Sequence, residues 1–231
     1  MVCTKTLYNY LHQGLLWVKA INLPLVTRRS LRKSVSSKYK RELGKSIELR
    51  DTTIEPQEEF GHWEIATIRR AKGKTDDVLL ISLIERKSRL YVALRCPSAR
   101  AGDVKETLET WLSTFRNNVE LGLLCKTITA DNGLEFAHTS DLKDEILSIY
   151  FARPYSAWER GSNERHNGLL RRFIPKGKQI ENISEHTLHR TLHWCNNLSR
   201  EILHYKTPQK VFLGEVNKIM DLHTVQFHIA I

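Results

Sequence analysis

Apolar positions in the first half of the chain form short runs that are typical of strands. Residues 62–68 mix apolar and polar positions, whereas residues 78–84 and 90–94 are continuously apolar. Short polar spacers separate the three runs. This arrangement predicts three antiparallel strands that follow one another as a meander.

Downstream of the meander, helical and strand spacing alternate. Helices are predicted at 103–115, about 160–173 and about 184–201, with short strands at 126–130 and 149–152. Such alternation is an α/β order. It fits a ribonuclease-H-like, integrase-type fold, in which a mixed five-stranded sheet has flanking helices.

The N-terminal part has a different pattern. Residues 4–11 predict a short helix with Thr4 at its cap, which looks like the last helix of a truncated DNA-binding unit. Residues 27–41 are strongly basic with little apolar content, and this predicts either a mobile linker that tracks phosphates or a solvated tether. We expect three parts: the N-terminal remnant and linker at 1–50, a catalytic core at 51–216 and a tail at 217–231.

Charge and cysteine content narrow the class of protein. The formal net charge is +10 over 231 residues, and such a balance favours an acidic partner, of which nucleic acid is the commonest, although charge can also serve solubility alone. The apolar runs are too short to span a membrane. Without a CxxC pair or a secretory segment, four reduced thiols in a cytoplasmic protein are predicted, at Cys3, Cys96, Cys125 and Cys195.

Two acidic residues stand in sequences that suit a metal ion bound against a polyanion. Asp131 follows a predicted strand, and Gly133 would let the chain turn beneath a ligand, although such a motif alone is more often only a turn. Glu164 shares a predicted helix face with Arg171. Carboxylates can hold paired Mg²⁺ ions for phosphodiester chemistry. The residues expected to bind phosphate are Arg165, Arg171, Arg172 and Lys176.

Four segments together resemble the IS-thirty group of bacterial insertion-sequence transposases. They are residues 61–64, 129–136, 154–164 and 167–171. The resemblance implies an integrase-like core with an Asp, Asp, Glu triad, Mg²⁺ or Mn²⁺ as cofactor, and helix-turn-helix units before the core that recognise terminal inverted repeats. It makes Asp131 the second acid and Glu164 the third, both as metal ligands. Members usually carry Asp two positions after the Trp-Glu pair, and here that position is Ala66.

The alanine decides what activity is expected. It offers no metal ligand, and Glu64, on the same strand face, would be about 6.6 Å away at ~3.3 Å per residue. We therefore expect a DNA transposase by family, hydrolysing and joining phosphodiesters at terminal inverted repeats, that is inactive or nearly so as written. The alternative is a non-catalytic DNA-binding protein or regulator derived from a transposase. Expected partners are double-stranded DNA, at the terminal repeats and the target, and further copies of the chain.

The sequence also contains a second candidate metal site, formed by histidines, and several tryptophans. His186, His189 and His193 have helical spacing, with Cys195 and His204 nearby, but the spacing matches no zinc motif and favours a packing and phosphate-facing surface. Most tryptophans are expected in the core, namely Trp63, Trp111 and Trp194. Trp158 is expected on a mobile loop that leads into Glu164.

Overall fold

The computed structural model describes residues 2–18, 43–51, 54, 57–70, 77–116, 121–143, 147–153 and 161–223. The chain divides into two compact units, Met1–Tyr39 and Lys40–Ile231, which we describe separately. The first contains helix α1 (Thr4–His12), as expected from its apolar spacing. Its N-cap is Cys3 rather than Thr4. The basic segment 27–41 and Trp158 lie outside the described residues, and the expected domain boundaries remain a prediction.

The second unit is built on a five-stranded sheet. Its strands are β1 (His62–Ile68), β2 (Leu79–Glu85), β3 (Tyr91–Cys96), β4 (Thr127–Ala130) and β5 (Ser148–Phe151). They lie in the order β3-β2-β1-β4-β5. The β1–β2 and β2–β3 pairs are antiparallel, whereas β4 is parallel to both β1 and β5. This mixed sheet with flanking helices confirms the predicted ribonuclease-H-like fold class.

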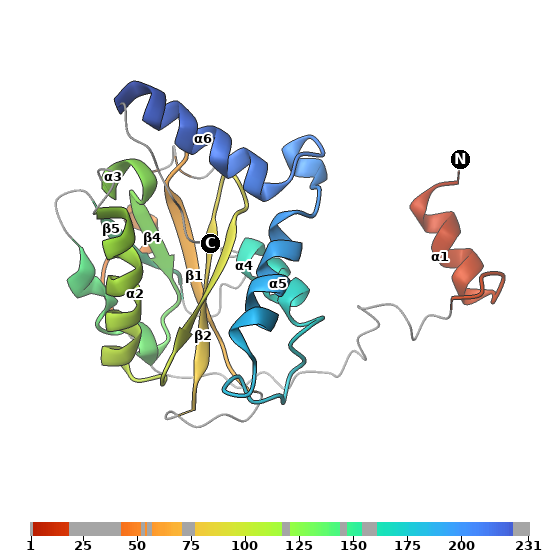
Figure 1. Cartoon of the computed structure of the whole chain (residues 1–231), viewed down its shortest axis with the longest axis horizontal. Helices are drawn as coiled ribbons and strands as arrows, with labels where there is room; N and C mark the ends of the chain where they lie inside the picture. Colours follow the sequence, from red (N-terminus) through yellow and green to blue (C-terminus); the bar gives the residue numbers. More distant parts are fainter. Residues whose placement is uncertain are drawn as a thin grey trace. The chain divides into compact units, whose positions relative to one another are not determined.

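Helices cover both faces of the sheet (Figure 1). They are α2 (Ala101–Arg116), the short α3 (Leu121–Leu124), α4 (Gly161–Leu170), α5 (Glu185–Asn196) and α6 (Pro208–His223). Three of them, α2, α4 and α5, correspond to the predicted helices. The sequence pattern did not lead us to expect α6. It begins at Pro208, a residue favoured at the first helical position because it has no N–H to leave unpaired.

Two apolar cores lie on opposite sides of the sheet. Ile65 of β1 belongs to the core beneath α2, whereas Ile68 of the same strand belongs to the core shared with α4 and α5. All seven residues of β2 are buried. A strand covered on both faces reads as a continuous apolar run, which explains the unbroken pattern from 78 to 84.

The tryptophans divide between core and surface. Trp63 is 1% exposed, its ring meets that of Trp111 edge to face at 5.0 Å, and its Nε1 donates to the Leu124 carbonyl at 2.8 Å. Both rings thus lie in the core, as predicted. Trp194 is only partly buried, but it packs against the core shared with α4 and α5.

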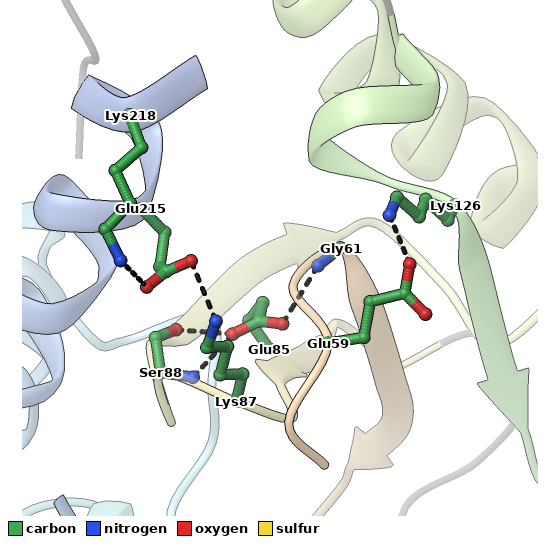
Figure 2. Close-up of polar contacts among 8 residues, drawn as sticks. All are labelled: Glu59, Gly61, Glu85, Lys87, Ser88, Lys126, Glu215 and Lys218. Atoms are coloured by element: carbon green, nitrogen blue, oxygen red, sulfur yellow. Dashed lines mark hydrogen bonds and ion pairs between the residues drawn. The ribbon is translucent and has the colours of Figure 1, made fainter. Parts of the chain in front are cut away.

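A buried carboxylate joins the turn between β2 and β3 to the start of β1 (Figure 2). Glu85 accepts hydrogen bonds from the backbone N–H of Gly61 at 3.1 Å and from the N–H and Oγ of Ser88, each at 2.6 Å. Its burial raises the pKa of this carboxyl group. Gly61 has a φ of +100°, a left-handed conformation that glycine adopts readily. These contacts hold the entry of β1 in place.

Ion pairs fasten two further segments at the same end of the sheet (Figure 2). Lys87 pairs with Glu215 of α6 at 2.9 Å, and Lys218 reaches the other oxygen of that carboxylate at 2.8 Å. Glu59 pairs with Lys126, the residue before β4. The two strands that carry the candidate site, β1 and β4, are therefore anchored at their first residues.

Candidate active site on the β1–β4 edge

Parallel pairing brings the Asp131 loop to the level of Ala66. Glu64 of β1 is aligned with Thr129 of β4. Continuing that register by two residues sets Asp131 beside Ala66, and the two-residue period of a strand keeps them on one face. That face carries Ile68 and packs against α4. The register therefore predicts that position 66 and Asp131 lie next to each other, on the face that packs against α4.

The loop after β4 is held in a specific shape. The Asp131 carboxylate accepts a hydrogen bond from the N–H of Gly133 at 3.0 Å, as in an Asx turn. Asn132 donates from its side chain to the Ala152 carbonyl beyond β5. Because both hydrogen bonds are made to backbone groups of the protein, the conformation of the loop does not depend on a bound ligand.

Glu135 is a second carboxylate in this loop. Its Oε1 accepts from the hydroxyl of Thr67 at 2.9 Å and pairs with Arg69 at 2.8 Å. A Cβ added at Gly133 would lie 2.6 Å from Oε2 of Glu135 and 2.8 Å from Oδ1 of Asp131. The two carboxylates therefore flank the glycine closely. Sequence reasoning gave Glu135 no role, although it is four residues after Asp131 in the same motif.

Small side chains surround position 66. Ala66 is aligned with Ser82 of β2, which is aligned in turn with Ala93 of β3. The Ser82 hydroxyl donates to the Ala66 carbonyl at 3.1 Å. Ala66 itself is 8% exposed. Ser82 and Ala93, the two residues aligned with position 66 across β2 and β3, thus bring no carboxylate to it.

Glu64 has a different partner. Its Oε1 lies 3.2 Å from Nε of Arg86, and both side chains are almost completely buried. Breaking a buried ion pair leaves an uncompensated charge, which costs about 3–5 kcal/mol. This engagement agrees with the expectation that Glu64 does not replace the missing acid.

Helix α4 is fastened to the sheet by side chains along its inner face. The hydroxyl of Tyr91, whose pKa is raised by burial, donates to Oδ1 of Asn167 at 2.7 Å. Asn163 is 1% exposed, and its side-chain amide has no hydrogen-bond partner among the described residues. The side chain of Glu164 lies outside the described part. Only its position on α4 is therefore established.

Arg171 has a structural role beside the phosphate contact predicted for it. Its guanidinium donates to the Arg69 carbonyl at 2.6 Å and to the Ile174 carbonyl at 3.4 Å. Burial lowers the pKa of this side chain. Arg171 therefore ties the end of α4 to the end of β1, and its phosphate contact stays a prediction.

The other predicted phosphate-binding residues are open to solvent. Arg165, Arg172 and Lys176 are exposed, and none of them has a carboxylate partner in the described ranges. Burial lowers the pKa of Arg200, and the nearby charges of Arg165 and Arg172 lower it further. Positive charge is thus concentrated where α4 and α5 meet.

The donor set does not complete a metal centre. No group of three His, Cys, Asp or Glu side chains that could hold a metal occurs within the described ranges. The histidines of α5 therefore provide no zinc site there. For Mg²⁺ or Mn²⁺, Asp131 offers a carboxylate, position 66 offers a methyl group, and the Glu164 side chain is not described. The described residues consequently do not fit a two-metal site.

Comparison with known proteins shows that the chain is similar in sequence to several transposases. It is 39% identical to the probable transposase of the insertion-like element IS1161 of Streptococcus salivarius, over 90% of this chain and 58% of that protein. It is 29% identical to the transposase InsI of element IS30C of Escherichia coli K12, over 73% of this chain and 42% of that protein. The chain thus spans about half the length of these relatives. No protein-family model matches it.

Among solved structures, the catalytic core domain of BIV integrase matches with a TM-score of 0.47 and 17% identity, over 69% of this chain and 97% of that chain. The topology of the sheet defines the class of the second unit as a ribonuclease-H-like core. Within that class, the sequence similarity makes the chain a relative of the IS30-type insertion-sequence transposases, as its motifs predicted. Of the helices described, none is long and apolar enough to cross a membrane.

Proposed function

We propose that the chain is the core of an insertion-sequence transposase that binds DNA and whose phosphodiester chemistry is disabled at position 66. The observation that supports this proposal is the parallel pairing of β1 and β4, whose register runs to Glu64 and Thr129, two residues before Ala66 and Asp131. In an intact core of this type, Mg²⁺ or Mn²⁺ activates the attacking oxygen for hydrolysis and strand transfer. This chain offers Asp131 and Glu164 toward such ions, and nothing at 66.

The chain's own basic residues would bind the substrate. Arg165, Arg172 and Lys176 are unpaired within the described ranges and lie along α4 and the turn after it. Arginine binds phosphate oxygens through two parallel hydrogen bonds. We assign them to the backbone of double-stranded DNA, both terminal inverted repeats and target, for a protein that acts in the cytoplasm as a homo-oligomer.

A second function is favoured by the same alanine. A chain that binds the terminal repeats without cutting them would compete with an active transposase, and so act as a DNA-binding regulator. The scaffold contacts of the Asp131 loop and of α4 do not involve the side chain at 66. DNA binding therefore does not depend on the missing acid.

Restoring the acid tests the proposal. The chain, its Ala66→Asp variant and an Ala66→Asn control of similar shape are incubated with Mn²⁺ and a labelled duplex that carries the element's terminal repeats. We expect strand cleavage with Ala66→Asp alone and equal DNA binding by all three proteins. Cleavage by the unaltered chain would refute the loss of activity. Binding by all three without any cleavage would favour the regulator.

A further inference from the structure

The outer face of α5 is rich in cationic and titratable side chains. Four residues at helical spacing, His186, His189, Arg190 and His193, are exposed. The opposite face, with Leu188, Leu192 and Cys195, is buried in the core shared with α4. The exposed face therefore has no packing role within the described part of the chain.

An aromatic and cationic cluster continues this face toward α4. The guanidinium carbon of Arg172 lies 5.7 Å from the centre of the Trp194 ring, in a cation–π contact. The Phe173 ring meets the same indole edge to face at 5.0 Å and is itself 40% exposed. Arginine stacked on an aromatic ring still has free N–H groups for a phosphate. The contact thus holds Arg172 in place without using its charge.

Negative charge is scarce on this surface. Glu185, at the start of α5, pairs with Arg95 of β3 at 3.0 Å. Across the described ranges, no carboxylate pairs with Arg172, Lys176 or Arg190. These cations are therefore balanced only by solvent ions. Release of such ions is the main source of affinity when a protein binds duplex DNA.

We propose that the outer face of α5, which carries Arg190 and the three histidines, is a second phosphate-binding tract for duplex DNA that extends the basic surface beyond Arg172. The 12 residues of α5 extend about 18 Å, roughly half a turn of B-form DNA. The tract would hold duplex that continues past the reacting phosphodiester. This inference rests on the proposed function, because it assumes a DNA substrate.

The histidines add a dependence on pH. An ordinary imidazole gains its charge between about pH 8 and 5. The charged and titratable groups on α5 and on the elements packed against it are Glu185, Arg190, Cys195, Tyr91, Arg95, Arg165, His166, Arg171, Arg172, Lys176, Lys178, Glu181, Arg200 and Glu201.

The experiment measures binding of a labelled 30-bp duplex by fluorescence anisotropy, using the full chain in Mg²⁺ at several salt concentrations. The variants are Arg190→Gln, Arg172→Gln and the triple change His186→Gln, His189→Gln and His193→Gln. Lys143→Gln removes one exposed positive charge beside η5 (Thr139–Leu142), which packs against α2, and serves as the matched control. Light scattering reports the oligomeric state of each protein.

We expect Arg190→Gln to reduce the slope of log affinity against log salt by about one. The factor by which Arg190→Gln weakens DNA binding at 50 mM salt should then be about 3.5-fold smaller at 200 mM salt. Lys143→Gln should match the unaltered chain. The unaltered chain should bind more tightly at pH 6 than at pH 8, and the triple variant should lose most of that difference.

Other outcomes distinguish a failure of the proposed function from a failure of the α5 tract alone. If the unaltered chain does not bind duplex at all, the proposed function fails together with the tract. If Arg172→Gln weakens binding whereas Arg190→Gln and the triple variant do not, only the α5 tract is refuted. If the α5 variants change the oligomeric state rather than the salt slope, the face is an interface between copies of the chain, and the tract is again refuted.

Discussion

The buried side chain of Asn196 closes the outer edge of β3, and removing it should destabilise the fold. Its Oδ1 accepts from the N–H of Tyr91 and its Nδ2 donates to the carbonyl of the same residue, both at 2.9 Å. Tyr91 is the first residue of β3, which is an edge strand with β2 as its only strand neighbour among those described. The amide thus replaces the missing strand at that point, and joins α5 to the sheet.

The magnitude follows from the groups left unpaired. Asn196 is 2% exposed, and Tyr91 is fully buried. In Asn196→Ala, one N–H and one C=O lose their partners, and each buried polar group left unsatisfied costs about 1–3 kcal/mol. We expect the free energy of unfolding to fall by about 2–6 kcal/mol. For a chain of this size the midpoint of thermal unfolding should fall by about 4–24 °C.

The neighbouring asparagine provides the control. Asn197 is exposed, and its side chain bonds to the His193 carbonyl at 3.0 Å and to Gln209 at 2.7 Å. Solvent can replace those bonds, so Asn197→Ala should cost less than about 1 kcal/mol. Urea and thermal unfolding, followed by circular dichroism, compare the two variants. Equal losses in both would refute the argument that Asn196 closes the β3 edge.

Two further predictions concern the loop after β4 and the start of β1. In the Ala66→Asp background, Gly133→Ala should abolish the regained cleavage and lower the unfolding free energy by about 1–3 kcal/mol, because the new Cβ would displace the hydrogen-bonded carboxylates of Asp131 and Glu135. Retained cleavage would contradict this. Burial lowers the pKa of His62, so its contribution to stability is present above pH 6.5 and is lost as the pH falls below that value. Unfolding free energies at pH 7.5 and 5.5 should therefore differ less in His62→Gln than in the unaltered chain, and an equal difference would count against it.

The sheet could be predicted because burial leaves a direct trace in the sequence. β2 is covered on both faces and therefore reads as a continuous apolar run. The order of strands in the sheet came from matching the alternation of elements to a known fold. The register between β1 and β4 could not be predicted, because it depends on pairing between residues that are 65 positions apart, such as His62 and Thr127.

The candidate site shows what helical spacing in the sequence cannot predict, namely the tertiary contacts of each residue. The face containing Glu164 and Arg171 predicted a phosphate contact for Arg171, and it gave no sign that this guanidinium also donates to the Arg69 carbonyl at the end of β1. Glu135 was overlooked for a similar reason, since its partners Thr67 and Arg69 belong to a distant strand. Trp194 lies on the face of α5 that carries Arg190, and its apolar character alone predicted a buried position. In each case, tertiary contacts determine the role.

The residue at position 66 affects both the proposed metal binding and the stability of the metal-free fold. An aspartate there would lie beside Asp131, with Glu135 bonded to the next residue of β1, Thr67. Neighbouring carboxylates repel one another and raise each other's pKa unless a cation offsets the charge. A methyl group in this row of small side chains removes that repulsion and leaves the hydrogen bonds of the Asp131 loop in place. Under the proposed function, the alanine would remove a metal ligand while favouring the metal-free fold, and DNA binding would persist where cleavage would not.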